Sequence, residues 1–377
     1  MSTIIRAATS AEFLSLVPHL LGCTPVRSLV LVPFVGSRTL GALRADLPVE
    51  ADTDDLDRIA STLIGLVCKV SHVDALALVV YTDDPVGATP RSHAALIDAL
   101  LSRADICGLE LRDALAVGPD GWTSYLDDAG ARPHAEPAPV GGDDHALDAD
   151  QFVRAELPEL GLLRTEHLAR LGLELENGLA DTWSASAATA ALHLSDPCVL
   201  FEDVVDAEPD PDDVPRLAGM MWALQRPALR DVALTQWATD LPTGDRALDA
   251  QLAFLDGDPI DEDLAETLLG EGEVPDVRRL TRGLDVCRHV AAAAPPALRP
   301  GPLAAAAWLS WALGRSTHAG TYAAQARAID DEHGLAGIVL ALVAGQRLPE
   351  WAFRREPPVA AATSPAGTGW SRGYPGR

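Results

Sequence analysis

Two adjacent carboxylates at the end of an apolar run are the residues of this chain best placed to do chemistry. The stretch LALVVYTDDP, residues 76–85, ends a β-branched run with Asp83 and Asp84. In α/β domains, ligands collect just beyond the carboxyl ends of parallel strands. Paired carboxylates there can hold Mg²⁺ or act as an acid and a base. Asp46 converges with this pair if its strand lies alongside, and Arg44, two residues away on the same face, can pair with Asp46. These four residues are the candidate ligand-binding site.

The tetrapeptide TDDP within this stretch is also ordinary turn chemistry. An Asp side chain hydrogen-bonds to the backbone that follows it, and Pro fixes φ at the next position. The sequence favours the turn over the site, and it places the mouth of any pocket at this end of the strand. It assigns no catalytic residue.

Sequence signatures of common enzyme and cofactor sites are absent from the 377 residues. The chain has no G-x-x-x-x-G-K-[ST], G-x-G-x-x-G, H-E-x-x-H or G-x-S-x-G motif. These motifs mark P-loop, dinucleotide, zincin and serine-hydrolase sites. We therefore predict no cofactor, and the sequence leaves open whether the protein is an enzyme.

Five cysteines are widely spaced, and none forms a C-x-x-C pair. They are Cys23, Cys68, Cys107, Cys198 and Cys287. Zinc sites and disulfide frameworks draw on short local clusters, so we predict no metal site. The first three lie in apolar stretches, which predicts buried, reduced thiols and fits a reducing cytoplasm.

The formal net charge of −26 indicates an acidic surface. Charge of this sign repels nucleic-acid phosphates and anionic lipid over long range. No stretch reaches the roughly 18 consecutive apolar residues of a membrane span. We therefore expect a cytoplasmic protein with neither nucleic acid nor membrane among its partners.

Apolar patterning over residues 1–126 alternates between helix and strand periods, which predicts an α/β domain with a mixed β-sheet flanked by helices. The expected helices are Ser10–Leu21, one opened by Asp52, and Thr89–Ala104, and the expected strands are Leu29–Val35, Leu40–Leu47, Ala75–Tyr81, Leu109–Val117 and Trp122–Leu126. The first two strands are expected to form a hairpin. Alternation predicts that Leu109, Leu111, Leu115 and Val117 share one face.

Beyond residue 126 the strand signal almost vanishes. Residues 127–150 are rich in Pro, Gly and Asp and predict a linker. Residues 151–356 predict a mainly helical region, and residues 357–377 a disordered tail.

Residues 304–334 resemble a TPR-like helical hairpin, that is, a tetratricopeptide-type unit. Small residues lie where such a unit has them, at Ala307, Gly314, Ala319, Ala323 and Ala326. Arrays generally need about three such units, and we find one. The alternatives are a helix pair packed on the rest of the helical region and a peptide-binding groove. Any protein partner is expected to bind through this helical region.

Several segments together resemble a known family. They are LVPHLLGCTPVRSLVLVPF, ALRADLP, LALVVYTDD, GWTSYL and the late AAWLSWALGRSTHAGTYAAQARAIDDEHGLA. The chain resembles an actinobacterial family known as domain of unknown function 4192, while the middle, residues 127–240, matches poorly. The resemblance implies an α/β domain plus helices in a cytoplasmic bacterial protein, and it implies no activity. The resemblance implies a cysteine-rich segment after the W-x-S-Y strand, as in many members of that family. This chain has LDDAGARPHAEPAP there, which puts any metal or redox role of that segment in doubt.

Two functions remain in competition. The missing catalytic motifs and the Ala-rich helical half favour a non-enzymatic binding or protein-interaction module. The alternative is a small-ligand or Mg-dependent enzyme with a pocket at the carboxyl ends of the N-terminal strands, near Asp46, Asp83 and Asp84.

Overall fold

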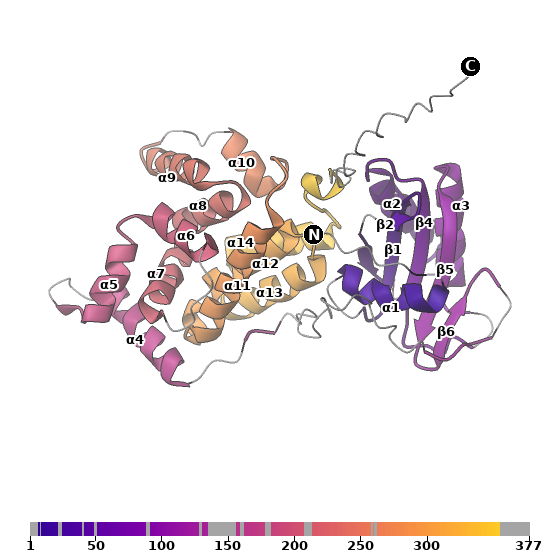
Figure 1. Ribbon diagram of the computed structural model, residues 1–377, viewed down its shortest axis with the longest axis horizontal. Coiled ribbons are helices and arrows are strands. Elements are labelled where there is room, and N and C mark those ends of the chain that lie inside the picture. Colours follow the sequence, from indigo (N-terminus) through magenta and orange to yellow (C-terminus); the bar gives the residue numbers. More distant parts are fainter. Residues whose placement is uncertain are drawn as a thin grey trace, which may run out of the picture.

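The chain folds into an α/β domain followed by a larger helical region (Figure 1). The computed structural model describes residues 7, 9–21, 25–39, 41–48, 51–87, 91–127, 130–134, 156–158, 162–177, 182–206, 213–257, 259 and 262–354. The elements of the α/β domain are α1 (Ser10–Leu21), β1 (Ser28–Val35), β2 (Arg38–Thr39), β3 (Leu43–Asp46), α2 (Thr53–Cys68), β4 (Ala75–Tyr81), α3 (Ala94–Ile106), β5 (Glu110–Gly118) and β6 (Gly121–Ser124). This arrangement confirms the predicted fold class.

The mixed sheet has the strand order β2-β1-β4-β5-β6, and β3 also pairs with β1. β1 runs antiparallel to β2, β3 and β4, whereas β4 and β5 are parallel and β6 returns antiparallel to β5. Because β3 and β4 both oppose β1, the strands β3, β4 and β5 point the same way. The apolar runs of β1 and β4 are buried almost throughout, as expected for strands covered on both faces.

Helices cover both faces of this sheet. The buried side chains of α2 and α3 pack on one face, against Leu29, Leu31 and Leu78. α1 covers the opposite face with Leu14 and Val17. β3 is left at an edge of the sheet, with β1 as its partner.

A β-bulge in β5 overturns one expectation. The register between β4 and β5 shifts at Arg112, which has no partner in β4. One extra residue turns the side chains that follow it to the other face of the sheet. Leu109 consequently packs with α2 and α3, whereas Leu115 packs with α1. The prediction that Leu109, Leu111, Leu115 and Val117 share one face is wrong.

Two element boundaries also differ from expectation. α3 begins at Ala94, after His93 in the left-handed region at φ 60°, rather than at residue 89. Residues 88–90 lie outside the described residues. The strand expected over residues 40–47 is shorter, because the turn after β1 pairs as β2 and β3 begins only at Leu43.

The start of the predicted linker packs back onto the sheet. Trp122 and Arg132 exchange backbone hydrogen bonds of 2.9 and 2.8 Å, and the Arg132 guanidinium lies 4.6 Å from the Trp122 ring centroid. Gly121, at φ 137°, is needed here because a Cβ atom would overlap the Arg132 carbonyl. Most of the predicted linker and the whole predicted tail lie outside the described residues, so the domain boundaries stay a prediction.

In the described part of the chain after residue 156, every regular element is helical. These elements are α4 (Leu162–Asn177), α5 (Ala185–His193), α6 (Pro197–Asp206), α7 (Val214–Leu224), α8 (Pro227–Ala238), α9 (Leu241–Leu255), α10 (Glu262–Leu269), α11 (Val277–Ala293), the 3₁₀ helix η3 (Pro296–Leu298), α12 (Pro300–Ala312), α13 (Ser316–Ile329), α14 (Gly334–Ala344) and the 3₁₀ helix η4 (Glu350–Phe353). None of the described helices is both long enough and apolar enough to cross a bilayer.

α12 is the central helix of this region. All of its residues are buried, and it packs against α11, α13 and α14. The expected small residues Ala307, Ala319, Ala323 and Ala326 are fully buried, and Gly314 lies in the turn between α12 and α13. These helices pack on the rest of the helical region, and their tetratricopeptide-like character stays a prediction.

Candidate functional site

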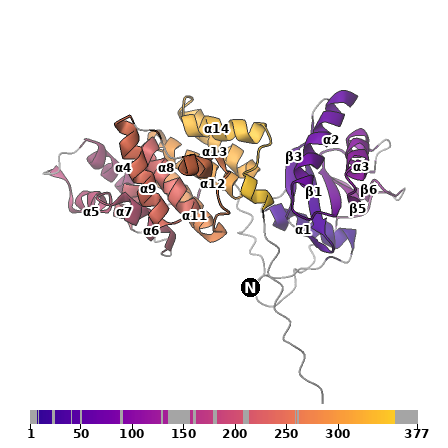
Figure 2. The ribbon, with the colours of Figure 1, turned by 90° about the horizontal axis from the view of Figure 1, so that it is seen from above.

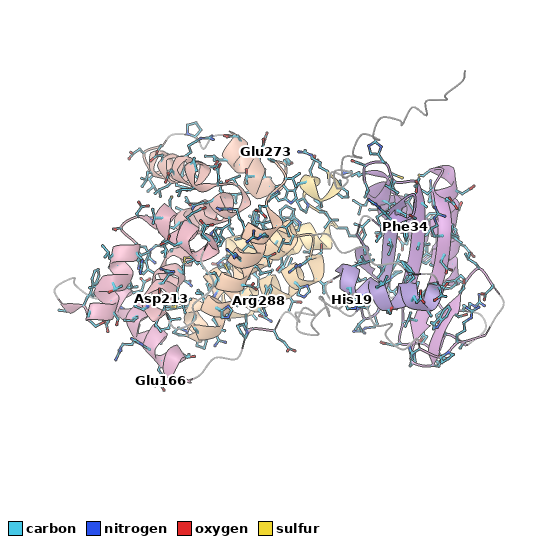
Figure 3. The ribbon with its side chains drawn as sticks, viewed as in Figure 1. His19, Phe34, Glu166, Asp213, Glu273 and Arg288 are labelled. Atoms are coloured by element: carbon cyan, nitrogen blue, oxygen red, sulfur yellow. The ribbon has the colours of Figure 1, made fainter. Side chains whose placement is uncertain are left out.

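A cleft lies between the α/β domain and the helical region. It has a volume of about 1100 Å³ and is lined by β3 and α2 on one side and by α13, the end of α14 and η4 on the other. Figure 2 shows the two parts facing each other, and Figure 3 places His19, near the end of α1, toward the helical region. Concave spaces between parts of a chain are preferred places for small-ligand sites.

Two of the four candidate residues line this cleft. Arg44 Nη2 lies 2.8 Å from Asp46 Oδ1, so the two side chains pair as their spacing suggested. Arg44 Nη1 also donates a 2.9 Å hydrogen bond to Thr317 Oγ1 at the start of α13. The Asp46 side chain is 82% exposed, and so exposed an ion pair contributes about 1 kcal/mol or less. A stronger acceptor entering the cleft can therefore replace Asp46.

A second arginine reaches the cleft from the helical region. Arg315 lies just before α13, lines the cleft and is half-buried. It makes no ion pair with any residue that the structure describes. Burial lowers the pKa of its guanidinium, and the charge of Asp285 opposes this shift. No side chain caps the N-terminus of α13, where a helix carries partial positive charge.

The far wall of the cleft is apolar, and its residues contact both the helical region and the α/β domain. η4 supplies Trp351 and Phe353, and Trp351 Nε1 donates a 2.9 Å hydrogen bond to the Ala312 carbonyl. From the end of α2, Lys69 Nζ lies 5.6 Å from the Phe353 ring centroid. Ser71 Oγ donates a 3.4 Å hydrogen bond to the Phe353 carbonyl. The cleft thus combines cationic groups with an aromatic wall.

The other two candidates lie in the turn after β4. The Asp83 side chain is 73% exposed, and its Oδ2 lies 3.7 Å from Arg27 Nε. Asp84 accepts a 2.8 Å hydrogen bond from the Ser92 hydroxyl, and its backbone N–H donates to Thr82 Oγ1 at 3.1 Å. These are turn contacts, and a ligand-binding role for Asp83 and Asp84 stays a prediction.

Strand β1 separates the two halves of the candidate set. Asp46 of β3 and Tyr81 of β4 are both opposite Ser28 of β1. The carboxyl ends of β3 and β4 therefore lie at the same end of the sheet. They are two strand spacings apart, about 10 Å, because β1 lies between them. The structure brings Arg44 and Asp46 together and does not bring Asp83 and Asp84 to them.

The carboxyl ends of β4 and β5 are covered by the loop that follows β4. Asp120 accepts backbone hydrogen bonds from Val86 at 2.7 Å and Gly87 at 3.1 Å, and these bonds hold its pKa below the usual range. The loop thereby occupies part of the space in which a ligand would meet the parallel strands. Among the described residues, no group of three or more His, Cys, Asp or Glu side chains forms a candidate metal site.

Sequence reasoning did not single out Arg315. No motif surrounds it, and an arginine before a helix is common in a chain whose basic residues are nearly all arginine. Only the docking of α13 against the edge strand β3 places Arg315 in the same cleft as Arg44.

A mixed-sheet domain joined to a helical region, with a cleft between them, defines a two-part α/β and helical protein. The chain belongs to the family described as Domain of unknown function (DUF4192), whose model matches residues 11–256. The match includes residues 127–240, where we expected a poor likeness, and ends before residues 304–334. No curated protein and no solved structure matches the chain.

Proposed function

We propose that the protein is a non-enzymatic binding protein whose cleft holds a small organic anion with an apolar body. The observation that carries the proposal is that Arg44 and Arg315, from separate parts of the chain, line one cleft of a protein with net charge −26. The uncapped start of α13 adds its positive end to the same place.

The size and lining of the cleft support this ligand class. A volume of about 1100 Å³ is slightly larger than that of typical small-molecule sites, which span roughly 300–1,000 Å³. Trp351 and Phe353 would cover the apolar body of the ligand, and Arg315 would bind its carboxylate, phosphate or sulfonate. Arg44 is already oriented by Thr317 and Asp46, so little side-chain entropy remains to be lost on binding.

Binding of 8-anilinonaphthalene-1-sulfonate, an aromatic sulfonate, tests the proposal. We expect the wild-type protein to bind one equivalent saturably, with a rise in dye fluorescence. Arg315→Gln should weaken the affinity by about tenfold or more, because a hydrogen bond to a charged group contributes about 1.5–3 kcal/mol. Fluorescence titration gives both dissociation constants.

Arg170→Gln is the matched control, because Arg170 lies on α4, its side chain is 66% exposed and it does not line the cleft. We expect this variant to bind the dye with wild-type affinity. Equal affinities for the two variants, or no saturable binding by the wild type, would refute the proposed function.

The two other functional hypotheses stay predictions. A Mg-dependent or small-ligand enzyme with a pocket at Asp83 and Asp84 gains no support from a turn whose side chains bind their neighbours. A protein partner for the helical region has no described contact that identifies it.

A further inference from the structure

The ends of α2 and α3 bring two cysteines together. Helix α2 connects β3 to β4, and α3 connects β4 to β5, between strands that point the same way. Both helices pack on the same face of the sheet and against each other (Figure 1). They therefore run parallel, with their C-terminal ends at the same edge of the domain.

Cys68 is the last residue of α2, and Cys107 caps the C-terminus of α3. Both side chains are exposed, so the expectation that these thiols are buried is wrong. The last buried residue of α2 is Val67, directly before Cys68, and that of α3 is Ala104, three residues before Cys107. Cys23, expected to be buried with them, lies outside the described residues.

The shared C-terminal edge of α2 and α3 places the two thiols near each other. Burial raises the pKa of the Cys68 thiol, and the neighbouring Cys107 thiol raises it further. The other two described cysteines differ, because Cys198 and Cys287 are buried in the helical core. Burial raises the pKa of Cys198 to about 12. Thiols in such surroundings are inert.

We propose that Cys68 and Cys107 form a reversible disulfide by exchange with low-molecular-weight disulfides. The thiolate of one cysteine attacks the reagent, forms a mixed disulfide and releases one reagent thiolate. The thiolate of the second cysteine attacks the protein sulfur of that mixed disulfide and releases the other reagent thiolate. Two protein thiols are oxidised, one reagent disulfide is reduced to two thiols, and two protons pass from protein to reagent.

The bond would fix the end of α2 at the junction between the two parts of the protein. Lys69 and Ser71 follow Cys68 directly and carry the contacts to Phe353 of η4. This site is independent of the proposed ligand, because neither cysteine lines the cleft.

Peptide mapping of the full chain after treatment with bis(2-hydroxyethyl) disulfide tests the proposal. Trypsin releases each thiol in its own peptide, Ile59–Lys69 and Ala104–Arg112. We expect these two peptides to appear joined, with the loss of two hydrogen atoms, and to separate again after dithiothreitol. We also expect the oxidised protein to melt about 5 °C higher than the reduced protein, because the bond closes a loop in the unfolded chain.

Single serine variants supply the controls, since both positions are exposed and a serine there should leave the fold intact. In Cys107→Ser, Cys68 should retain one reagent adduct, and Cys68→Ser should leave the adduct on Cys107; neither should gain the rise in melting temperature. Separate adducts on both cysteines of the wild type overturn the proposal. Pairing of either cysteine with Cys23 overturns it as well, and a Cys23→Ser chain should still form the joined peptide.

Discussion

Trp237→Ala should lower the free energy of unfolding by about 3–5 kcal/mol, an effect we expect to be among the largest of any single truncation in the helical region. Trp237 of α8 is fully buried, and its Nε1–H donates a 2.8 Å hydrogen bond to the Phe201 carbonyl of α6. Its ring meets the Phe201 ring edge-on, with centroids 6.3 Å apart. Truncation would leave a large cavity and would remove the indole hydrogen bond at the junction of the two helices.

A third helix makes the cavity hard to close by relaxation. Gly283 of α11 approaches the Trp237 ring so closely that a Cβ atom there would lie 2.9 Å from a ring carbon. The backbone of α11 therefore defines one wall of the site, and backbone atoms move less readily than a side chain to fill a void. Urea denaturation followed by circular dichroism at 222 nm measures the loss as a lower midpoint.

Trp222→Ala is the matched control, because it removes the same side chain from a half-buried position on α7. The Trp222 ring stacks on the Arg226 guanidinium, 3.3 Å from its centroid, a contact that contributes about 0.5–1 kcal/mol at a partly exposed site. We expect a small shift in midpoint for this variant. Equal losses in the two variants would show that the Trp237 side chain does not organise the core.

Where a signal is local, the sequence predicts the structure closely. The helix expected from Asp52 begins where Asp52 Oδ1 accepts the Asp55 N–H at 2.9 Å, which is a standard cap. The apolar run of β4 has the predicted bounds, Ala75–Tyr81. In the candidate site, the pairing of Arg44 with Asp46 is equally local, because strand periodicity alone puts both side chains on one face.

Features that depend on tertiary placement were not predictable in this way. The bulge at Arg112 cannot be recognised from the alternation of apolar and polar residues. The residues after it alternate in the same way whichever face of the sheet they occupy. The expected convergence of Asp46 with Asp83 required adjacent strands, and the insertion of β1 between β3 and β4 separates them. Arg315 enters the candidate site only through the packing of two segments that are far apart in the chain.

The half-buried ion pair between Glu202 and Arg279 gives the second large effect. Arg279 Nη1 and Nη2 lie 2.6 and 2.8 Å from the two carboxylate oxygens of Glu202, with the side chains 17% and 19% exposed. Gln236 Nε2 donates to the same carboxylate at 2.8 Å and to the Cys198 carbonyl at 2.9 Å. The network therefore joins α6, α8 and α11.

Glu202→Gln should lower the free energy of unfolding at neutral pH by about 2–3 kcal/mol. The amide group cannot accept both guanidinium hydrogen bonds, and partly buried Arg279 keeps only the exposed Asp206 carboxylate, 3.9 Å away, as a countercharge. Urea denaturation at neutral pH measures this difference. Asp263→Asn is the matched control, because its 2.6 Å pair with Arg246 joins side chains that are 58% and 53% exposed, and exposed pairs contribute about 0–1 kcal/mol.

The effect of Glu202→Gln should also depend on pH with a definite sign. The hydrogen bonds from Arg279 lower the pKa of Glu202 below its ordinary value of 4.5, against the opposing effect of burial. A carboxylate with a depressed pKa in the folded state contributes stability that is fully present above its unfolded pKa and is lost as the pH falls through the folded value. The difference between wild type and Glu202→Gln should therefore be constant above about pH 5 and shrink below pH 4.5. A difference that stays unchanged through this window would show that the substitution acts through packing rather than through the charge of Glu202.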